Sequence, residues 1–458
     1  MALMARPENK KKNNFRPKPK NKADAARILA LEVLSAVLDK GLPLDSCFDD
    51  SVAKANLTNL DNRFARYLVA TTLRRMGQID LILNSYFEKP LEHRNREGLH
   101  ILRMGACQIL FMDTADHAAV STSVDLLNAR KMAGIAKLGN AVLRKLVGDQ
   151  AKWQDRLTND DGMQRVSLPI WLRQRWIKTY GQDKVTELAK VFLSIPPFDL
   201  TVANRSEQTK LVDSLEGQAL GPSTIRLKST GSNITSLPGF KEGQWWLQDL
   251  AATLPVSALG EIQNLDVADL CAAPGGKSLQ LAAAGAKVLS LDKSDHRLKR
   301  VRENLVRTNL TAEIVAEDVL EWSQKTSKRF DLVVLDAPCS ATGTIRRHPD
   351  ILWNRDPAKL LQYVPVQKEM LSAAAGLVKP GGQLLYAVCS QETEEGERQI
   401  EAFLSRNSDF QIEAIDPALI SPMAEAVQEE GWARTLPTML ADQGGLDGFF
   451  FAKLRRNS

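Results

Sequence analysis

The chain has 458 residues, 44% of them hydrophobic and 25% charged, and this composition is typical of a soluble globular protein with about three domains. No apolar run is long enough to span a bilayer, and the first residues lack the apolar stretch of a secretory signal. We therefore expect a cytoplasmic protein without membrane contact. The five cysteines lack paired spacing, and no CxxC or Cys/His cluster occurs, which argues against a disulfide framework and against a metal site.

Positive charge is concentrated at the amino end. Residues 1–22 hold eight Lys/Arg and one acid, whereas the rest of the chain has 52 basic and 54 acidic residues. A segment this basic, with prolines and asparagines between the charges, is expected to be disordered. We interpret it first as an arm that binds phosphates, because neutralising phosphates releases counterions. A solubilising tail and a targeting sequence are the alternatives.

Residues 23–150 predict an all-α bundle with few strand signals. Apolar residues recur at the i, i+3, i+4 spacing of packed helices in residues 25–38, 64–74, 79–87, 99–111, 118–129 and 139–146. Asp24 is the expected N-cap of the first helix, and Gly41 is its expected stop. Cys47 and Cys107 lie in apolar surroundings and are expected to be buried.

Residues 151–240 predict a linker and a small α+β module, because strand character follows a double proline after a helical stretch. Trp171 and Trp176 alternate with Arg173 and Arg175. The tryptophans could stack on bases while the arginines contact phosphates. Aromatic residues at helical spacing more often belong to a core, and that interpretation is preferred.

Residues 241–458 alternate between strand and helix patterns. Strands are expected at residues 265–271, 286–292, 312–315, 332–335 and 383–388, and helices at 278–284, 296–308 and 366–377. Such alternation predicts a mostly parallel sheet with helices on both faces.

A tight glycine turn follows the first of these strands. Residues 276–278 could be taken for the end of a phosphate loop, but Cys271 stands where that motif needs a glycine, and GxGxxG is absent. What remains is the turn at residues 274–276 and an acid, Asp292, at the end of the next strand. A carboxylate there suits a ribose diol. The pattern favours a ligand with adenosine and no phosphate, and S-adenosylmethionine is the usual one.

Two cysteines follow strands of this sheet. Asp336 ends the strand at 332–335, with Cys339 shortly after it, and Cys389 follows the strand at 383–388. Ligands of open α/β sheets collect at the carboxyl ends of the strands. The two thiols are therefore expected to lie together in one ligand site at this end of the sheet.

Three segments together resemble, in order and spacing, the motifs of RNA (cytosine-5)-methyltransferases: residues 269–277, 336–340 and 386–390. Residues 447–454 are similar to that family's final strand, which inserts antiparallel into the sheet. The resemblance implies a Rossmann-like class I methyltransferase domain of α/β class that uses S-adenosylmethionine.

The helical region carries a second resemblance. Residues 61–63, 99–111, 117–120 and 140–144 are similar to the NusB fold, which commonly binds RNA. Residues 344–350, which follow the first thiol, add to the match. Together with the two resemblances they imply a member of the family that acts on bacterial 16S ribosomal RNA. The partner is then 16S rRNA or a partly assembled small subunit, and a monomer is expected.

The implied domain order is a disordered basic tail at 1–22, a NusB-like all-α RNA-binding domain at 23–150, a linker and small α+β module at 151–240, and the catalytic domain at 241–458.

Family precedent implies the roles of the site residues. Cys389 adds to carbon 6 of cytosine, which puts electron density on carbon 5 so that it can take the methyl group. Cys339 assists release of the product, although residue type alone does not decide which thiol attacks. The methyl donor is expected to meet Cys271, Ala272, Ala273, Pro274, Gly275, Gly276, Lys277, Asp292, Asp318 and Asp336.

The three acids have separate implied roles. Asp292 is expected on the ribose, Asp318 near the adenine, and Asp336 near the methionine end, the cytosine edge, or both. For each acid the alternative is a strand-end or helix-capping carboxylate, and it stays open for Asp318. The Cys271 thiol has no implied role beyond packing.

The sequence also departs from the family pattern. Val388 stands where threonine is usual, Gly396 where asparagine is common, and Thr201 and Ala203 where an arginine and an asparagine are often found. Both thiols and all strand-end acids remain, so the chemistry is expected to persist. The alternative functions are the same chemistry on transfer RNA or another rRNA site, and a non-catalytic RNA-binding or ribosome-assembly factor.

Overall fold

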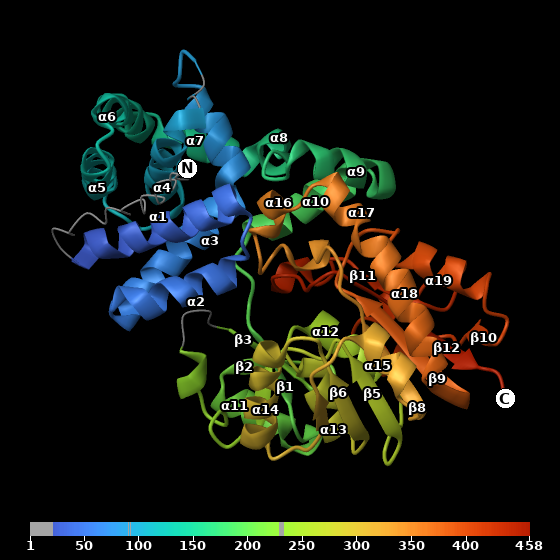
Figure 1. Cartoon of the computed structure of the whole chain (residues 1–458). Helices are drawn as coiled ribbons and strands as arrows, with labels where there is room; N and C mark the ends of the chain where they lie inside the picture. The colour runs from blue at the N-terminus through green and yellow to red at the C-terminus, as the bar shows by residue number, and fades with distance from the viewer. Residues whose placement is uncertain (1–21, 90, 92, 229–232) are drawn as a thin grey trace, which may run out of the picture. The chain divides into compact units, whose positions relative to one another are not determined.

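A computed structural model of the chain describes residues 22–89, 91, 93–228 and 233–458. The chain divides into two compact units, Met1–Asp160 and Asp161–Ser458. Figure 1 shows helices without strands in the described part of the first unit, and sheets in the second. Apart from Lys22, the predicted basic tail lies outside the described residues. None of the helices described is long and apolar enough to cross a membrane.

The first unit confirms the predicted all-α bundle. Its helices are α1 (Lys22–Lys40), α2 (Leu44–Ala55), α3 (Asn59–Asn84), the short 3-10 turn η1 (His93–Asn95), α4 (Arg96–Phe111), α5 (Asp116–Ala129), α6 (Ala133–Gly148) and α7 (Gln150–Asn159). Helix α4 packs against α3, α5 and α6, and its Cys107 is fully buried. Gly41 has a φ of +67° directly after α1, as expected of a residue that ends a helix.

Two expectations for this unit were wrong. The helices predicted at 64–74 and 79–87 are one helix, α3, which runs through Gly77. A glycine inside a helix costs about 1 kcal/mol, and burial of Met76 and Ile79 around it outweighs that cost. Asp24 is not an N-cap, because α1 begins at Lys22. Helices α2 and α7 were not predicted; both are short, and each buries only two residues.

The second unit opens with the predicted α+β module. Its helices are α8 (Asp161–Arg165), α9 (Ile170–Tyr180), α10 (Gln182–Leu193) and α11 (Gln208–Ser214). Its strands are β1 (Asp199–Val202), β2 (Gly217–Leu220), β3 (Thr224–Leu227) and β4 (Trp245–Leu247). They pair antiparallel in the order β2-β3-β1-β4.

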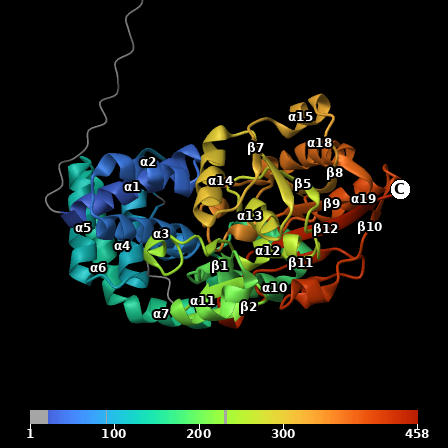
Figure 2. The same cartoon turned by 90° about the horizontal axis from the view of Figure 1, so that it is seen from below.

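The larger sheet has the predicted mostly parallel topology. Its strands are β5 (Asp266–Leu270), β6 (Lys287–Leu291), β7 (Glu313–Val315), β8 (Phe330–Asp336), β9 (Val378–Val388), β10 (Phe410–Ile412), β11 (Ala433–Thr435) and β12 (Phe449–Arg456). The order is β10-β12-β9-β8-β5-β6-β7, and β11 also pairs with β12. Strand β12 inserts antiparallel beside β9, as expected of the final strand, and Figures 1 and 2 both show it there.

Helices cover both faces of this sheet. They are α12 (Leu250–Ser257), α13 (Gly276–Ala283), α14 (Asp295–Thr308), α15 (Val319–Lys325), α18 (Tyr363–Gly376) and α19 (Glu397–Leu404). Two short helices, α16 (Ile351–Asn354) and α17 (Pro357–Leu361), lie in the connection between β8 and α18, and α16 packs against α9 and α10. Along β8, Val333 packs into the core beneath α15, α18 and α19, while Val334 packs into the core beneath α12 and α13. A strand buried on both faces has no polar side to expose, which is why its sequence is continuously apolar.

Candidate active site

The two predicted thiols lie together at the carboxyl ends of neighbouring strands. Cys339 follows β8 and Cys389 follows β9, and these strands pair in parallel with Asp336 opposite Ala387. The two sulfurs are 3.5 Å apart. The hydrogen bond between the thiols and the burial of Cys339 raise the pKa of the Cys339 thiol well above its usual range. Cys339 therefore keeps its proton at neutral pH.

A lysine and an aspartate form an ion pair at the same edge of the sheet. Lys277 Nζ donates to Asp336 Oδ2 over 2.7 Å, and its side chain lies over the Phe449 ring. Burial would lower the pKa of Lys277, but the Asp336 carboxylate outweighs burial and the net shift is upward. The amine is therefore charged. The Asp336 side chain keeps 32% of its surface exposed, so it is accessible to a ligand.

The glycine turn contains two residues with positive φ, one of them not a glycine. Cys271 has a φ of +63° and Gly275 a φ of +106°. The positive φ of Gly275 favours glycine, and a Cβ there would also meet Val301 side-chain carbons at a tight 3.2 Å. The Cys271 thiol packs against the core, and burial raises its pKa, which makes it unreactive.

Asp292 holds this turn against the end of β6. Its Oδ2 accepts the Ala273 amide over 3.2 Å, and its Oδ1 accepts the Ser294 amide over 2.9 Å. The Asp292 side chain is 2% exposed. Arg297 Nη1 also lies 3.5 Å from Oδ2. A carboxylate has about four acceptor positions, so these three contacts leave capacity for one ligand hydroxyl.

Asp318 occupies a different kind of position. It is the N-cap of α15, and its Oδ1 accepts the Leu320 amide over 2.9 Å. The capping alternative describes this residue in the structure, and an adenine contact stays a prediction.

Two buried carboxylates of the site were missed. Asp269, inside β5, accepts the Ser278 hydroxyl over 2.5 Å, and burial raises the pKa of Asp269 to about 7. Glu395 is fully buried beside the two serines that follow the thiols, Ser340 and Ser390. An acid inside an apolar strand could have identified Asp269. Nothing in the run of glutamates near 395 distinguishes Glu395 from its neighbours.

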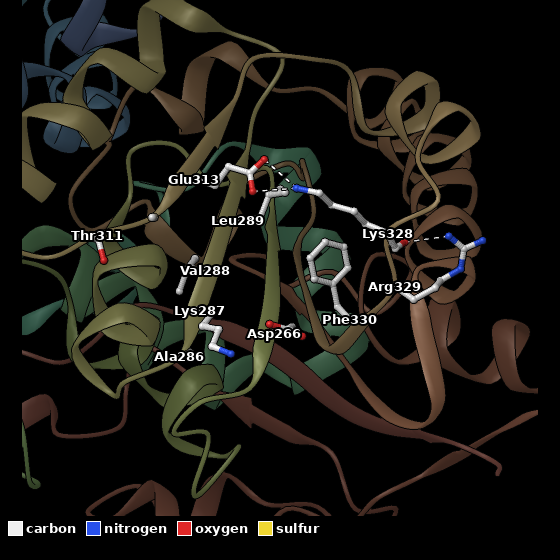
Figure 3. A pocket seen from close by; sticks show the side chains of 11 residues that line it. Asp266, Ala286, Lys287, Val288, Leu289, Thr311, Glu313, Lys328, Arg329 and Phe330 are labelled. Atoms are coloured by element: carbon white, nitrogen blue, oxygen red, sulfur yellow. Dashed lines mark hydrogen bonds and ion pairs between the residues drawn. The ribbon is translucent and has the colours of Figure 1, made fainter.

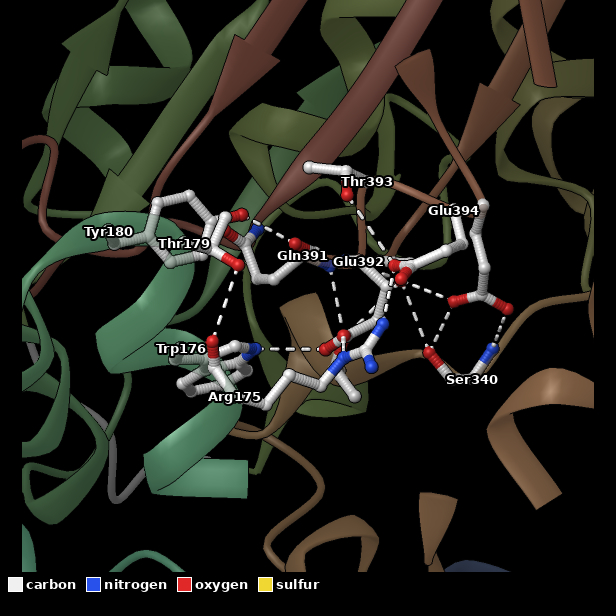
Figure 4. A network of polar contacts seen from close by, with 12 residues as sticks. Arg175, Trp176, Thr179, Tyr180, Ser340, Gln391, Glu392, Thr393 and Glu394 are labelled. Atoms are coloured by element: carbon white, nitrogen blue, oxygen red, sulfur yellow. Dashed lines mark hydrogen bonds and ion pairs between the residues drawn. The ribbon is translucent and has the colours of Figure 1, made fainter. Parts of the chain in front are cut away.

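Helix α9 binds the segment after Cys389, as Figure 4 shows. Arg175 pairs with Glu392 and Glu394, and Trp176 Nε1 donates to Glu392 Oε1 over 2.9 Å. Trp176 is 1% exposed, so the preferred core interpretation is correct for it and base stacking is wrong. The alternative phosphate contact of Arg175 is not supported either, because two carboxylates hold its guanidinium. Trp171 packs at the margin of the same core.

The departures at 388 and 396 have local explanations. Val388 is fully buried in the core of the sheet. A Cβ on Gly396 would come within 2.7 Å of an Arg434 nitrogen and 2.8 Å of the Phe450 ring. Arg434 pairs with Glu397 and donates to the Ser390 carbonyl oxygen over 2.9 Å. Arg434 and Phe450 thus occupy the space that a side chain at 396 would need.

The opposite edge of the sheet holds a hollow of about 530 Å³, shown in Figure 3. It is lined by the first residues of four strands, Asp266, Lys287, Glu313 and Phe330. None of the predicted site residues lines it. Within the part of the chain that the structure describes, no cluster of His, Cys, Asp and Glu side chains could hold a metal ion.

Comparisons with known proteins agree with this architecture. Residues 257–455 match the family described as 16S rRNA methyltransferase RsmB/F, and residues 24–148 match the NusB family. Ribosomal RNA small subunit methyltransferase B of Proteus mirabilis is 35% identical over 398 residues, covering 84% of this chain and 92% of the relative. Its namesake from Pasteurella multocida is 32% identical, covering 94% of this chain and 96% of the relative.

A solved structure shares the fold. The crystal structure of PH0851 superposes with a TM-score of 0.73 at 21% identity, covering 96% of this chain and 100% of that one. The sequence matches show that the chain belongs to the RsmB/F family of 16S rRNA methyltransferases and is an S-adenosylmethionine-dependent methyltransferase of ribosomal RNA.

Proposed function

We propose that this enzyme methylates carbon 5 of a cytosine in 16S rRNA through a covalent adduct with Cys389. The observation that carries the proposal is the 3.5 Å separation of the Cys339 and Cys389 sulfurs at the ends of adjacent strands. Methylation of a nitrogen or oxygen atom of RNA needs no thiol. A ring carbon that is a poor nucleophile does need covalent activation, and a thiolate supplies it.

The Cys389 thiolate adds to carbon 6 of the base, and the former carbon 5–carbon 6 double bond becomes the electron pair of an enamine. Carbon 5 uses that pair to bond the methyl group. Loss of the carbon 5 proton then expels the sulfur, which restores both the aromatic base and the thiolate. The bound cofactor supplies the methyl group from a positively charged sulfur. The target base must leave its stack to reach Cys389.

Cys339 acts in the release step. Its sulfur lies beside that of Cys389, and its raised pKa keeps it protonated at neutral pH. A protonated thiol at this position can donate a hydrogen bond to the Cys389 sulfur as the carbon 6–sulfur bond breaks, which stabilises the departing thiolate, while the carbon 5 proton leaves to solvent. The division of labour between the thiols follows the family precedent. The geometry supports it because only one of two adjacent thiols can readily ionise at a time.

The described residues fit S-adenosylmethionine. The turn from Cys271 to Lys277 brings backbone close to the end of β5, and Gly275 leaves no side chain in the way. Asp292 keeps an acceptor position for the ribose, and Asp336, about one-third exposed beside Lys277, would meet the methionine end or the cytosine edge. Asp318 is placed near the adenine only by family precedent.

The test uses the purified full chain with methyl-labelled cofactor and three substrates: 16S rRNA, small subunits and transfer RNA. The expected result is label in 16S rRNA that nucleoside mass spectrometry identifies as 5-methylcytidine. Label on a nitrogen or on a ribose oxygen would overturn the chemistry. Label confined to transfer RNA would move the same chemistry to another substrate, and no label on any substrate would favour the assembly-factor alternative.

A further inference from the structure

One buried carboxylate connects the two thiol loops. Ser340 follows Cys339 directly, Ser390 follows Cys389 directly, and both serine hydroxyls donate to Oε2 of Glu395. We infer that Glu395 is a positioning residue that sets the distance between the two thiols. This inference rests on the proposed function, in which both thiols act.

The contacts of Glu395 use both of its oxygens. Oε1 accepts the Ser340 amide over 2.9 Å and the Gln367 side chain over 3.1 Å, while Oε2 accepts the two serine hydroxyls. The serine oxygens are 3.1 Å apart, close to the 3.5 Å between the sulfurs that precede them. The carboxylate therefore fixes both loops one residue away from the reacting atoms.

The surroundings of Glu395 hold its carboxylate still. Its own carbonyl oxygen accepts the Tyr386 hydroxyl of β9 over 2.7 Å. Gln367, on α18, also donates to the Pro338 carbonyl oxygen in the Cys339 loop over 2.9 Å. Contacts from a strand and a helix position a group more firmly than loop contacts alone.

A carboxylate is suited to this place because all of its side-chain partners are neutral donors. A buried charge is costly unless hydrogen bonds compensate for it, and here burial raises the pKa of Glu395 while the serine and glutamine bonds oppose that rise. Because its side-chain partners are neutral, the negative charge of the Glu395 carboxylate also acts on neighbouring groups. Glu395 adds to the larger effects of Cys389 and burial that raise the pKa of Cys339.

Replacing the carboxylate would release the loops. In Glu395→Gln, one oxygen becomes an NH2 group that cannot accept from the serine hydroxyls or from the Ser340 amide. Buried donors would then lack partners, and the loops would shift to satisfy them. A displacement of about 1 Å at a reacting group can reduce a rate by about 100-fold.

The experiment compares Glu395→Gln with a matched control, Glu394→Gln. Glu394 pairs with Arg175 and Arg398 and contacts neither serine. Two measurements are made on the full chain: kcat and KM of methyl transfer, and binding of phenylarsine oxide, which bonds to two sulfurs only when both are within reach. For Glu395→Gln we expect kcat to fall about 100-fold, with KM for RNA and cofactor nearly unchanged and arsenical binding clearly weakened. Glu394→Gln should match the wild type in both measurements.

A normal kcat together with normal arsenical binding in Glu395→Gln would overturn the inference. If that variant does not fold, Ser340→Ala and Ser390→Ala each remove one bond to the carboxylate, and unchanged arsenical binding in both would likewise overturn it. Arsenical binding requires no RNA. Weakened binding in Glu395→Gln would therefore support the positioning role even if the wild type proved not to form 5-methylcytidine, which would count against the proposed function alone.

Discussion

The two edges of the larger sheet carry different polar chemistry. At the amino ends of the strands, charged side chains such as Lys328 and Glu313 pair in solvent, with half of each side chain exposed. At the carboxyl ends, Glu395 and Asp269 are fully buried, and Lys277 is nearly so. Burying charge is costly, whereas exposed pairs contribute about 0–1 kcal/mol. The buried charged groups lie at the edge where the chemistry is proposed. This indicates that they serve to position groups of the site and not to stabilise the fold.

The largest effect is expected for the nucleophile. Cys389→Ala should abolish methyl transfer, because no other group in the proposed mechanism adds to carbon 6. Scintillation counting of methyl-labelled 16S rRNA measures this. Cys47→Ala, which removes a buried thiol of the helical unit, is the control and should retain transfer. Normal turnover by Cys389→Ala would show that the carboxyl edge of the sheet does not supply the nucleophile, and the proposed functional difference between the two edges would be lost.

The second thiol should produce a different failure. Cys339→Ala should accumulate a covalent RNA adduct on Cys389, because addition proceeds while release is impaired. The adduct should appear as a retarded band on a denaturing gel. The double variant Cys339→Ala/Cys389→Ala should show no such band. Absence of the band from the single variant under turnover conditions would contradict the assigned roles.

Removing a buried cation near the carboxyl edge should cost stability. Arg346 is fully buried, lies 2.6 Å from an Asp249 oxygen and 3.6 Å from an Asp447 oxygen, and also donates to the Gly444 carbonyl oxygen. Arg346→Met would leave buried carboxylates with less compensation, so we expect a loss of about 3–5 kcal/mol in the free energy of unfolding. Urea titration at constant pH measures it. A loss below about 1 kcal/mol in the free energy of unfolding would show that the Arg346 ion pairs contribute no more than exposed ion pairs do.

Stability should also depend on pH through Asp269, whose pKa is raised to about 7 chiefly by burial. Below about pH 4 both folded and unfolded chains hold this proton. As pH rises from 4 to 7, the unfolded chain releases the proton and the folded chain keeps it. The folded state therefore loses up to about 4 kcal/mol of stability from this group over that range.

Asp269→Asn lacks the titrating group. Urea unfolding at pH 5 and pH 7.5 should therefore show the stability of the wild type falling relative to this variant at the higher pH. Parallel changes in the two proteins would contradict the raised pKa.

The smallest effect is expected at the amino edge. Lys328→Met breaks an exposed pair with Glu313, so the free energy of unfolding should change by about 0–1 kcal/mol, and methyl transfer should stay at the wild-type rate. The same urea titration and labelling assay apply. A loss as large as that of Arg346→Met would show that the two edges do not differ in the way described.

Much of the fold could be predicted because its signals are local. Continuous apolar runs such as residues 332–335 are dictated by burial on both faces of a strand, and Cys339 and Cys389 were predicted to meet because carboxyl ends of parallel strands share an edge. Gly41 ends its helix for a local conformational reason. The strand and the helix end need only neighbouring residues to be recognised, whereas the meeting of the thiols, 50 positions apart, follows from the general topology of a parallel sheet.

The remainder depends on contacts between distant residues. Lys277 and Asp336 are 59 positions apart and Ser340 and Glu395 are 55 apart, so no spacing rule joins them. The local pattern leaves phosphate contact open for Arg175, and only its carboxylate partners, more than 200 positions away, account for its guanidinium. Strong burial likewise let α3 run through a glycine that the local pattern treats as a break.

The antiparallel strand β12 has a consequence for the order in which the site can form during synthesis. It supplies one of the two neighbours of β9, the strand that ends at Cys389, and it is made after every other strand of the sheet. Until residues 449–456 emerge from the ribosome, one side of β9 presents unpaired N–H and C=O groups. The segment just before β12 also closes the thiol loops, because the Gly448 amide donates to the Gly343 carbonyl oxygen over 2.9 Å. A nascent chain therefore carries both sulfurs well before it carries a completed site.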